Sequence, residues 1–244
     1  LAGEARCRWI ELREKGSTPH VANTDVSRHK VREILPLPDD SDLLWGNYPA
    51  KLRSQVKRAW KNGLKERIGG RELVPDFYDV YLRNMRFLGS PPLPQAFFEW
   101  IADRSGASVS TCCVMEGRVP VAASFMIASG TTLEVPWAAS RPQYRTSSAN
   151  MLLYWAMIRH AVESGHRIFD MGRSTPGSGS HRFKTQWGGI SQPLEWRYWR
   201  RDDYPLPGYT HGDGQFALAR RVWRFLPLGV TRSLGGRLIR HIPS

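Results

Sequence analysis

The chain has 244 residues and a formal charge of +13, because 35 Lys and Arg residues stand against 22 Asp and Glu; its pI is about 10.2. Hydrophobic residues make up 41% and aromatic residues 11%, so a folded core is expected, and disorder, collagen and low-complexity fibres are excluded. No window reaches the roughly 18 uninterrupted apolar residues of a membrane-spanning helix. The high pI suggests a polyanionic partner, such as RNA, a nucleotide, phospholipid or a phosphorylated substrate; a compositional bias towards arginine is the alternative explanation.

The cysteines and the first residues bear on the compartment. Cys7, Cys112 and Cys113 cannot build a disulfide framework, which favours a reducing, cytoplasmic compartment. The opening residues carry charges where a signal peptide needs an apolar stretch. There is no initiator Met, and the strand expected at 8–12 has nothing before it to pair with, so we expect the sequence to begin inside a domain. The Cys and His residues lack metal-ligand spacing, so no metal site is predicted.

In chain order, two short early strands are followed by predicted helices, then by a run of strands, then by a strand–helix–strand unit. A helix begins at about Ser41, with Ser41 and Asp42 as N-cap candidates, and helical spacing resumes after Pro49 and stops at Gly63. Short turns join three of the strands into an antiparallel meander. The expected strands are 8–12, 31–36, 109–115, 119–128, 132–138, 167–171 and 193–199, and the later helices are 75–88, 95–104, 150–164 and 181–187.

The fold class that follows is α/β or α+β, with a mixed sheet flanked by helices. The strand at 132–138, the helix at 150–164 and the strand at 167–171 form a βαβ-like unit. The start of its helix is a natural site for an anionic group. The small-residue loop at 172–180 lacks the Lys and the spacing of a P-loop, so phosphate binding and a plain flexible loop are equal alternatives.

The positive charge concentrates in two stretches. Residues 51–71 hold eight basic residues and one acid, and Arg53, Lys57 and Lys61 lie on one helical face. The tail at 215–244 holds six arginines and no acid and predicts one or two basic amphipathic helices. The tail either lies on an anionic inner membrane leaflet, which we slightly favour, or packs as a helix of a missing N-terminal half.

Chemically useful residues gather between 134 and 187, at the expected ends of neighbouring strands. They include two carboxylates that could act as a general base, Glu134 and Asp170, and several cations and aromatic rings. The alternative is that Trp137 and Trp187 are core aromatics and that Asp170 pairs structurally with Arg173. The full cluster is Glu134, Trp137, Tyr144, Arg145, Asn150, Tyr154, Asp170, Arg173, Ser174, Lys184 and Trp187.

The run FDMGRSTPGSGSHRFKTQWGG at 169–189 resembles the signature of FemAB-like proteins, particularly the branch linked to exosortase/PEP-CTERM systems. Three further stretches resemble the same family in the same order: KLRSQVKRAWKNGLKER at 51–67, FYDVYLRNMRFLGSPPLP at 77–94 and YRTSSANMLLYWAMIRHAVESG at 144–165. The resemblance covers about residues 25–200.

The resemblance implies a tandem pair of GNAT-type acyltransferase domains. Residues 1–40 would be the remnant of a truncated first domain, 41–205 the second GNAT-like domain and 206–244 the basic tail. Relatives with known chemistry transfer an amino acid from aminoacyl-tRNA to an amine on a lipid-linked or nucleotide-linked peptidoglycan precursor. The implied function is aminoacyl or other N-acyl transfer to a cell-envelope or exopolysaccharide precursor.

The resemblance also assigns residues to roles. Phe183 and Lys184 match the F-K pair near the acyl-transfer site, where Lys184 would stabilise an oxyanion. Arg53 and Lys57 match a basic helix that faces a phosphate-rich substrate. The residues that match the loop and helix cradling a pyrophosphate are Tyr144, Arg145, Asn150 and Tyr154. The expected substrate-binding set also contains Trp137, Arg173, Ser174 and Trp187, and the catalytic set is Lys184, Asp170 and Glu134.

The turn at 145–150 departs from ordinary GNAT enzymes because it has no glycine. A residue with a Cβ does not easily adopt a positive φ or let a pyrophosphate approach the backbone. This weakens the case for acetyl-CoA; aminoacyl-tRNA and acyl-CoA stay open as donors, and tRNA as a partner. The expected location is cytoplasmic, with peripheral attachment to the inner membrane as an option. A non-catalytic module that binds RNA or an anionic glycan through its basic helix is the alternative function.

Overall fold

The computed structural model describes residues 9–14, 24–201 and 214–239, which pack as two units. Unit 1 contains the described residues up to 35 and those from 171 to 201. Unit 2 contains 36–170 and 214–239. The chain passes from one unit to the other between Asp170 and Met171. The two units are defined by packing within the chain. The domain boundaries at 40 and 205 come from the resemblance to a family, and they stay a prediction.

The sheet of unit 2 runs in the order β7-β6-β5-β4-β3. Its first four strands in the chain, β3 (Leu64–Gly69), β4 (Val109–Glu116), β5 (Val119–Ser129) and β6 (Thr132–Ser140), pair antiparallel. Strand β7 (Ile168–Ser174) begins parallel to β6, which makes the sheet mixed. The predicted meander and βαβ unit are confirmed, whereas β3 was not predicted.

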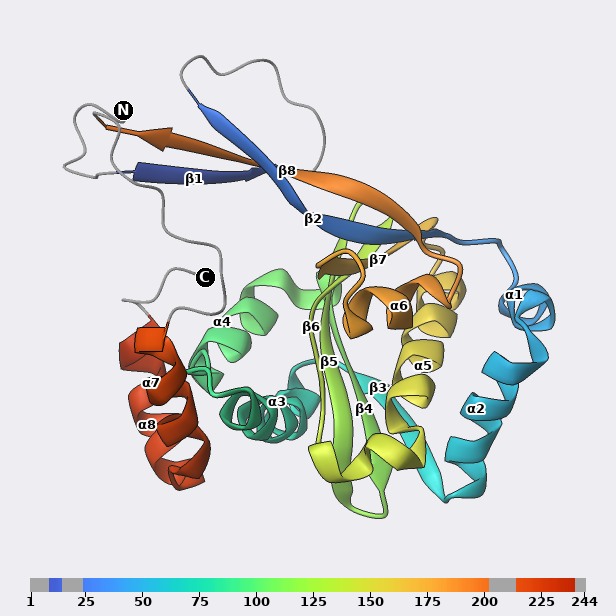
Figure 1. The fold of residues 1–244 in the computed structure, drawn as a ribbon. Coiled ribbons are helices and arrows are strands. Elements are labelled where there is room, and N and C mark those ends of the chain that lie inside the picture. The colour runs from blue at the N-terminus through green and yellow to red at the C-terminus, as the bar shows by residue number, and fades with distance from the viewer. Residues whose placement is uncertain (1–8, 15–23, 202–213, 240–244) are drawn as a thin grey trace. The chain divides into compact units, whose positions relative to one another are not determined.

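Helices cover both faces of this sheet (Figure 1). On one face lie α3 (Val74–Leu88) and α4 (Gln95–Ser105), and on the other lie α2 (Ala50–Lys61) and α5 (Ala149–Glu163). The core on the α3 side contains Phe77 and Phe98 from the helices and Phe125 from β5, all fully buried. Successive strand residues point to opposite faces, so Cys113 belongs to this core and Cys112 lies on the face that α5 covers.

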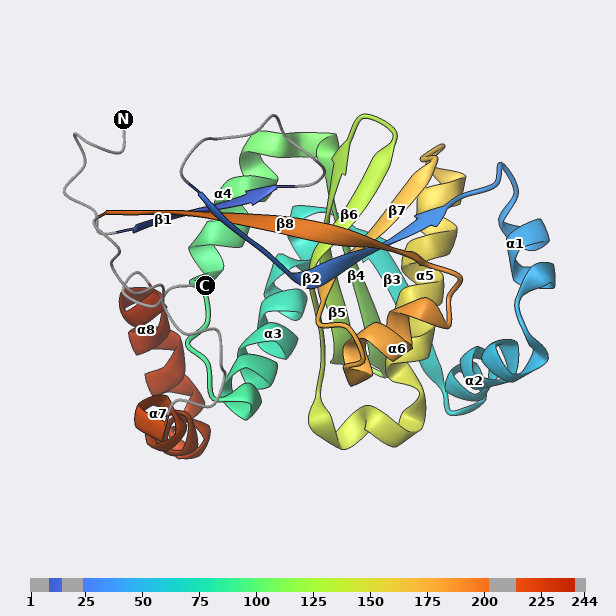
Figure 2. The same ribbon diagram turned by 45° about the horizontal axis from the view of Figure 1, so that its top comes forward.

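Two differences from the expected helices have simple causes. Helix α1 (Ser41–Asn47) is capped by Asp40, not by Ser41 or Asp42, because the Asp40 carboxylate accepts from the Asp42 N–H at 2.8 Å. Helix α5 begins at Ala149, one residue before the predicted start. The predicted tail helices are α7 (Gly214–Phe225) and α8 (Leu228–Leu238); both pack against α3 and lie side by side in Figures 1 and 2.

Unit 1 contains the strands β1 (Trp9–Glu14), β2 (Asp25–Pro36) and β8 (Ile190–Arg200), in the order β1-β8-β2. Both outer strands pair antiparallel with β8. Strand β1, near the start of the chain, therefore pairs with β8, the last strand in the sequence. Unit 1 also holds α6 (Gly179–Thr185), and its small core contains Leu194, Trp196 and Tyr198.

Candidate functional site

The N-terminal end of α5 holds a contact between an arginine and a serine. Ser148, which precedes α5, is buried and adopts a φ of 63°. Arg58 of α2 donates to the Ser148 hydroxyl from Nε at 2.9 Å and from Nη2 at 2.7 Å. The Ser148 carbonyl accepts from the N–H groups of Met151 and Leu152 at 3.0 and 3.1 Å. The start of α5 is thus fixed by α2 and by its own first turn.

We expected the turn at 145–150, which has no glycine, to avoid a positive φ. Ser148 adopts one, so this expectation is wrong. A left-handed residue with a Cβ costs about 1–2 kcal/mol, and the hydrogen bonds of Ser148 offset that cost. Arg58 was not predicted, because it lies off the helical face that carries Arg53 and Lys57. Each step of one residue along a helix turns the direction of the side chain by about 100°. The sequence carries no signal for Arg58 that Lys57 lacks.

The predicted stripe on α2 is divided between two roles. Arg53 Nη1 donates to the Gly46 carbonyl at 2.7 Å, so it satisfies the end of α1. Lys57 and Lys61 are exposed. Of the three residues in this stripe, Lys57 and Lys61 are therefore the two whose charge is open to solvent.

The residues predicted to cradle a pyrophosphate have different surroundings. The Tyr144 hydroxyl donates to Glu116 Oε2 at 2.6 Å, and this hydrogen bond is the main cause of the raised pKa of Tyr144. Tyr154 is buried, and burial raises its pKa. Asn150 is half-buried in the first turn of α5. The side chain of Arg145 lies outside the part of the chain that is described.

The two predicted general bases lie on neighbouring strands. Glu134 of β6 and Asp170 of β7 are partners in the parallel register, and Asp170 is 1% exposed. Trp137, further along β6, packs its ring edge-to-face on Phe98 with the centroids 5.2 Å apart. This is the packing that the core-aromatic alternative for Trp137 describes.

In unit 1, the lysine of the F-K pair is buried beside the end of β7. Lys184 Nζ donates to the carbonyl oxygens of Gly172 at 3.1 Å and Arg173 at 2.9 Å. Trp187 is fully buried and Phe183 half-buried. The Arg173 guanidinium lies 5.7 Å from the centre of the Trp196 ring. The Lys184 ammonium therefore provides a fixed positive charge next to two backbone carbonyls.

The small-residue loop before α6 is held at several points. Ser174 is buried, with its hydroxyl 3.5 Å from that of Ser180. Lys30 donates to Thr175 at 2.7 Å. Ser178 caps α6 by accepting from the His181 N–H at 3.1 Å. These contacts tie the loop to β2 and to α6.

A buried carboxylate also anchors this loop. Ser191 donates to both oxygens of Glu33 at 2.9 and 2.8 Å, and His181 Nε2 lies 3.1 Å from the Ser191 hydroxyl. Glu33 is fully buried. Sequence reasoning missed Glu33 and Ser191, because residues so far apart in the chain give no joint signal.

The predicted site residues are distributed over both units. Those in unit 1 are Arg173, Ser174, Phe183, Lys184 and Trp187, and those in unit 2 are Arg53, Lys57, Glu134, Trp137, Tyr144, Arg145, Asn150, Tyr154 and Asp170. Within unit 2, α2 and the start of α5 meet through Arg58. A single crevice that combines residues of both units stays a prediction.

Residues 50–185, more than half of the chain, match the family model of the acetyltransferase (GNAT) domain. The chain belongs to the GNAT family. No curated protein sequence matches it.

Solved structures show the same fold. FemX superposes with a TM-score of 0.59 at 14% identity, over 79% of this chain and 66% of FemX. The C-terminal domain of a protein from Agrobacterium fabrum, described as a lysylphosphatidylglycerol synthetase, gives 0.59 at 15% identity, over 75% of this chain and 64% of that domain. L-PGS from Bacillus licheniformis gives 0.53 at 14% identity, over 84% and 68%. This chain thus spans slightly less than two thirds of the first two structures.

Proposed function

We propose that this GNAT domain transfers an aminoacyl or other N-acyl group to a precursor of the cell envelope, as a FemAB-like protein. The observation that carries the proposal is Lys184, buried with its ammonium held beside the end of β7 in a chain of the GNAT family. The agreement of four sequence stretches with FemAB-like proteins supports the same assignment. One structural neighbour carries a name that describes joining a lysyl group to phosphatidylglycerol.

The chemistry asks little of the protein. A neutral amine attacks the carbonyl carbon of an activated ester or thioester, a C–N bond forms, and the C–O or C–S bond breaks as the leaving group departs. Lys184 would stabilise the oxyanion of the tetrahedral intermediate. Asp170 or Glu134 would accept the proton of the amine. Correct orientation of the two substrates lowers the activation barrier by several kcal/mol more. The upper limit of this effect is about 7–11 kcal/mol.

Phosphate groups of the donor would bind at the start of α5. The N–H groups of the first helical turn attract anions, and Arg58 places a guanidinium next to them. Aminoacyl-tRNA and acyl-CoA both carry phosphate, so this end of the helix suits either donor. For the acceptor, a peptidoglycan or exopolysaccharide precursor and an anionic lipid are the alternatives.

The test is transfer of a radiolabelled acyl group by the purified chain, with charged tRNA and acyl-CoA supplied separately and an envelope extract as acceptor. Lys184→Met keeps most of the side-chain volume and removes the charge. We expect it to lower turnover by about 100-fold or more, as for loss of one oxyanion donor. The control is Lys65→Met, which removes an exposed lysine of β3.

A folded Lys184→Met variant with unchanged turnover contradicts the assignment; circular dichroism establishes that it is folded. The alternative function is a binding module that uses exposed Lys57 and Lys61 of α2. It is favoured if no donor is turned over while Lys57→Gln together with Lys61→Gln abolishes binding to RNA or an anionic glycan.

A further inference from the structure

Helix α7 is apolar on two sides. Trp223 is buried on the side that packs against the rest of unit 2. Leu218, Val222 and Phe225 recur at the spacing of one helical stripe, and they are 69%, 53% and 81% exposed. Trp223 follows Leu218 by five residues, which places it about 140° around the helix from the start of the stripe. The stripe therefore faces away from the core.

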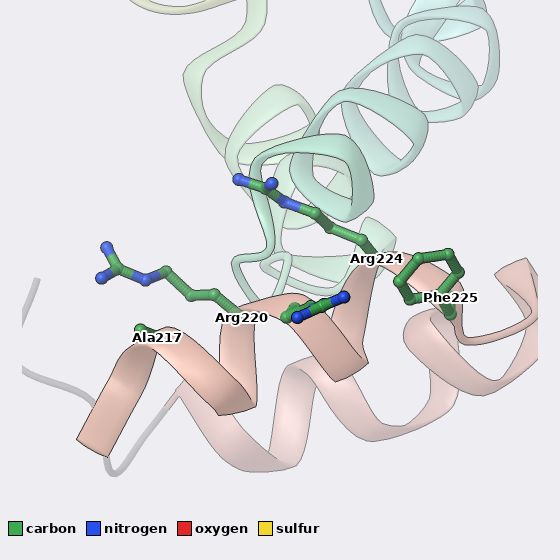
Figure 3. Close-up of a pocket in the computed structure, with 5 residues that line it drawn as sticks. Ala217, Arg220, Arg224 and Phe225 are labelled. Atoms are coloured by element: carbon green, nitrogen blue, oxygen red, sulfur yellow. The ribbon is translucent and has the colours of Figure 1, made fainter. Parts of the chain in front are cut away.

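Arginines share the helix with this stripe. Arg220, Arg221 and Arg224, together with Ala217 and Phe225, line a hollow along α7, and Arg220 lies on the side of the helix that approaches Gly89. Figure 3 shows the side chains of Arg220 and Arg224 extending from the helix, with Phe225 at its end. Residues 214–239 contain five arginines and neither Asp nor Glu. Exposed apolar area and positive charge are thus combined on one helix.

Helix α8 adds a second exposed row. Val230, Leu234 and Leu238 recur every four residues and are 38%, 38% and 41% exposed. Arg232 and Arg237 of the same helix are also exposed. Both tail helices therefore present apolar side chains and arginines to solvent, although neither is long and apolar enough to cross a membrane.

We propose that α7 and α8 bind an anionic lipid surface, with the exposed stripe of α7 in the headgroup–acyl boundary. Lipid phosphates would pair with the arginines, whose long aliphatic stems let the charge stay at the interface while the stripe enters the lipid. A protein partner would have to cover the stripe and supply several acids, since burying an unpaired guanidinium is costly. This inference rests on the tail alone and holds whether or not the proposed acyl transfer is correct.

The test is flotation of the chain with vesicles of pure phosphatidylcholine and with vesicles that contain 30 mol% or so of phosphatidylglycerol. We expect binding only to the anionic vesicles, and weaker binding at high salt. Val222→Ser with Phe225→Ser should weaken it by about tenfold or more. Replacing Arg221 and Arg224 by Gln should weaken it about fivefold per arginine.

Matched controls are Leu43→Ser, at an exposed apolar residue of α1, and Arg118→Gln, at an exposed arginine between β4 and β5. These should bind as the unchanged chain does. Absence of binding, equal binding to both vesicle types, or equal effects of the controls overturns the proposal. So does a concentration-dependent dimer that is lost in the Val222 and Phe225 variants, because a second copy would then cover the stripe.

Discussion

Arg58 of α2 donates two hydrogen bonds to the hydroxyl of Ser148, which is the one non-glycine residue with a positive φ in the part of the chain that the structure describes. At the start of α5, the steric cost of the positive φ at Ser148 is thus accompanied by two stabilising hydrogen bonds from Arg58. An anion arriving at this end of the helix would compete with the Ser148 hydroxyl for the same guanidinium. The contact is therefore both a structural tie and a position that donor binding would change.

The first prediction separates the backbone cost at Ser148 from its hydrogen bonds. Ser148→Ala keeps the Cβ in the left-handed region and removes the acceptor for Arg58, whereas Ser148→Gly removes both. We expect the Gly variant to be more stable than the Ala variant by about 1 kcal/mol, because glycine adopts a positive φ without the steric cost. Urea unfolding measures the difference. An Ala variant as stable as the Gly variant contradicts this account.

The second prediction concerns the seam between α8 and the loop before α4. A Cβ on Gly235 would lie 2.4 Å from Pro92 Cδ and 2.9 Å from the Pro92 carbonyl oxygen. Gly235→Ala should therefore lower the free energy of unfolding by about 1–3 kcal/mol. The control is Gly229→Ala in the same helix, where a Cβ meets nothing within 4 Å and helix propensity favours Ala. Equal effects of the two changes would refute close packing at Gly235.

The third prediction is a loss of stability in mild acid that depends on His160. Burial is the main cause that lowers the pKa of His160 below 6.5, and the charge of His166 adds to it. Between pH 6.5 and the lower folded pKa, the unfolded chain binds a proton that the folded chain does not, so stability falls as pH falls. Urea midpoints at pH 7 and pH 5 should differ less in His160→Gln than in the unchanged chain. Identical differences would contradict the prediction.

The fourth prediction concerns the two neighbouring thiols in β4. Burial raises the pKa of Cys112 well above its usual value and that of Cys113 to about 12. At pH 8 a thiol of that pKa is ionised in roughly one molecule in ten thousand. Iodoacetamide should leave both cysteines unmodified in the native chain and alkylate both in guanidinium, as mapped by mass spectrometry. Rapid native labelling at either site would contradict their burial.

Much of this fold can be predicted from the sequence because the apolar residues of many helices and strands recur with a clear period. The meander of β4, β5 and β6 has apolar strands and glycine turns, and Gly117 and Gly130 adopt positive φ in those turns. Strand β3 was missed because Lys65, Glu66 and Arg67 place charges on a short edge strand, where the apolar signal is weakest. The predicted caps of α1, Ser41 and Asp42, lie one and two residues after the observed cap, because Asp40, Ser41 and Asp42 are all good caps.

The candidate site is less accessible to sequence reasoning because its contacts join distant residues. The family motif points to Lys184, but its carbonyl partners follow only from the path of β7 into α6. The contact between Arg58 and Ser148 spans 90 positions, and the one between Glu33 and Ser191 spans 158. Local pattern selects residue types at a helix or strand end, whereas the tertiary fold decides which of them meet.

The hydrogen bonds that link Glu33, Ser191 and His181 also bear on the tautomer of His181. The Gly177 N–H donates to His181 Nδ1 at 3.2 Å, so the single hydrogen of the neutral ring resides on Nε2 and points to the Ser191 hydroxyl. Ser191 in turn donates to Glu33, which completes a one-way chain of donors that ends on a buried carboxylate. A neutral imidazole oriented in this way has its lone pair engaged by the backbone. His181 therefore ties the loop before α6 to Ser191 at the start of β8 through contacts at both ring nitrogens.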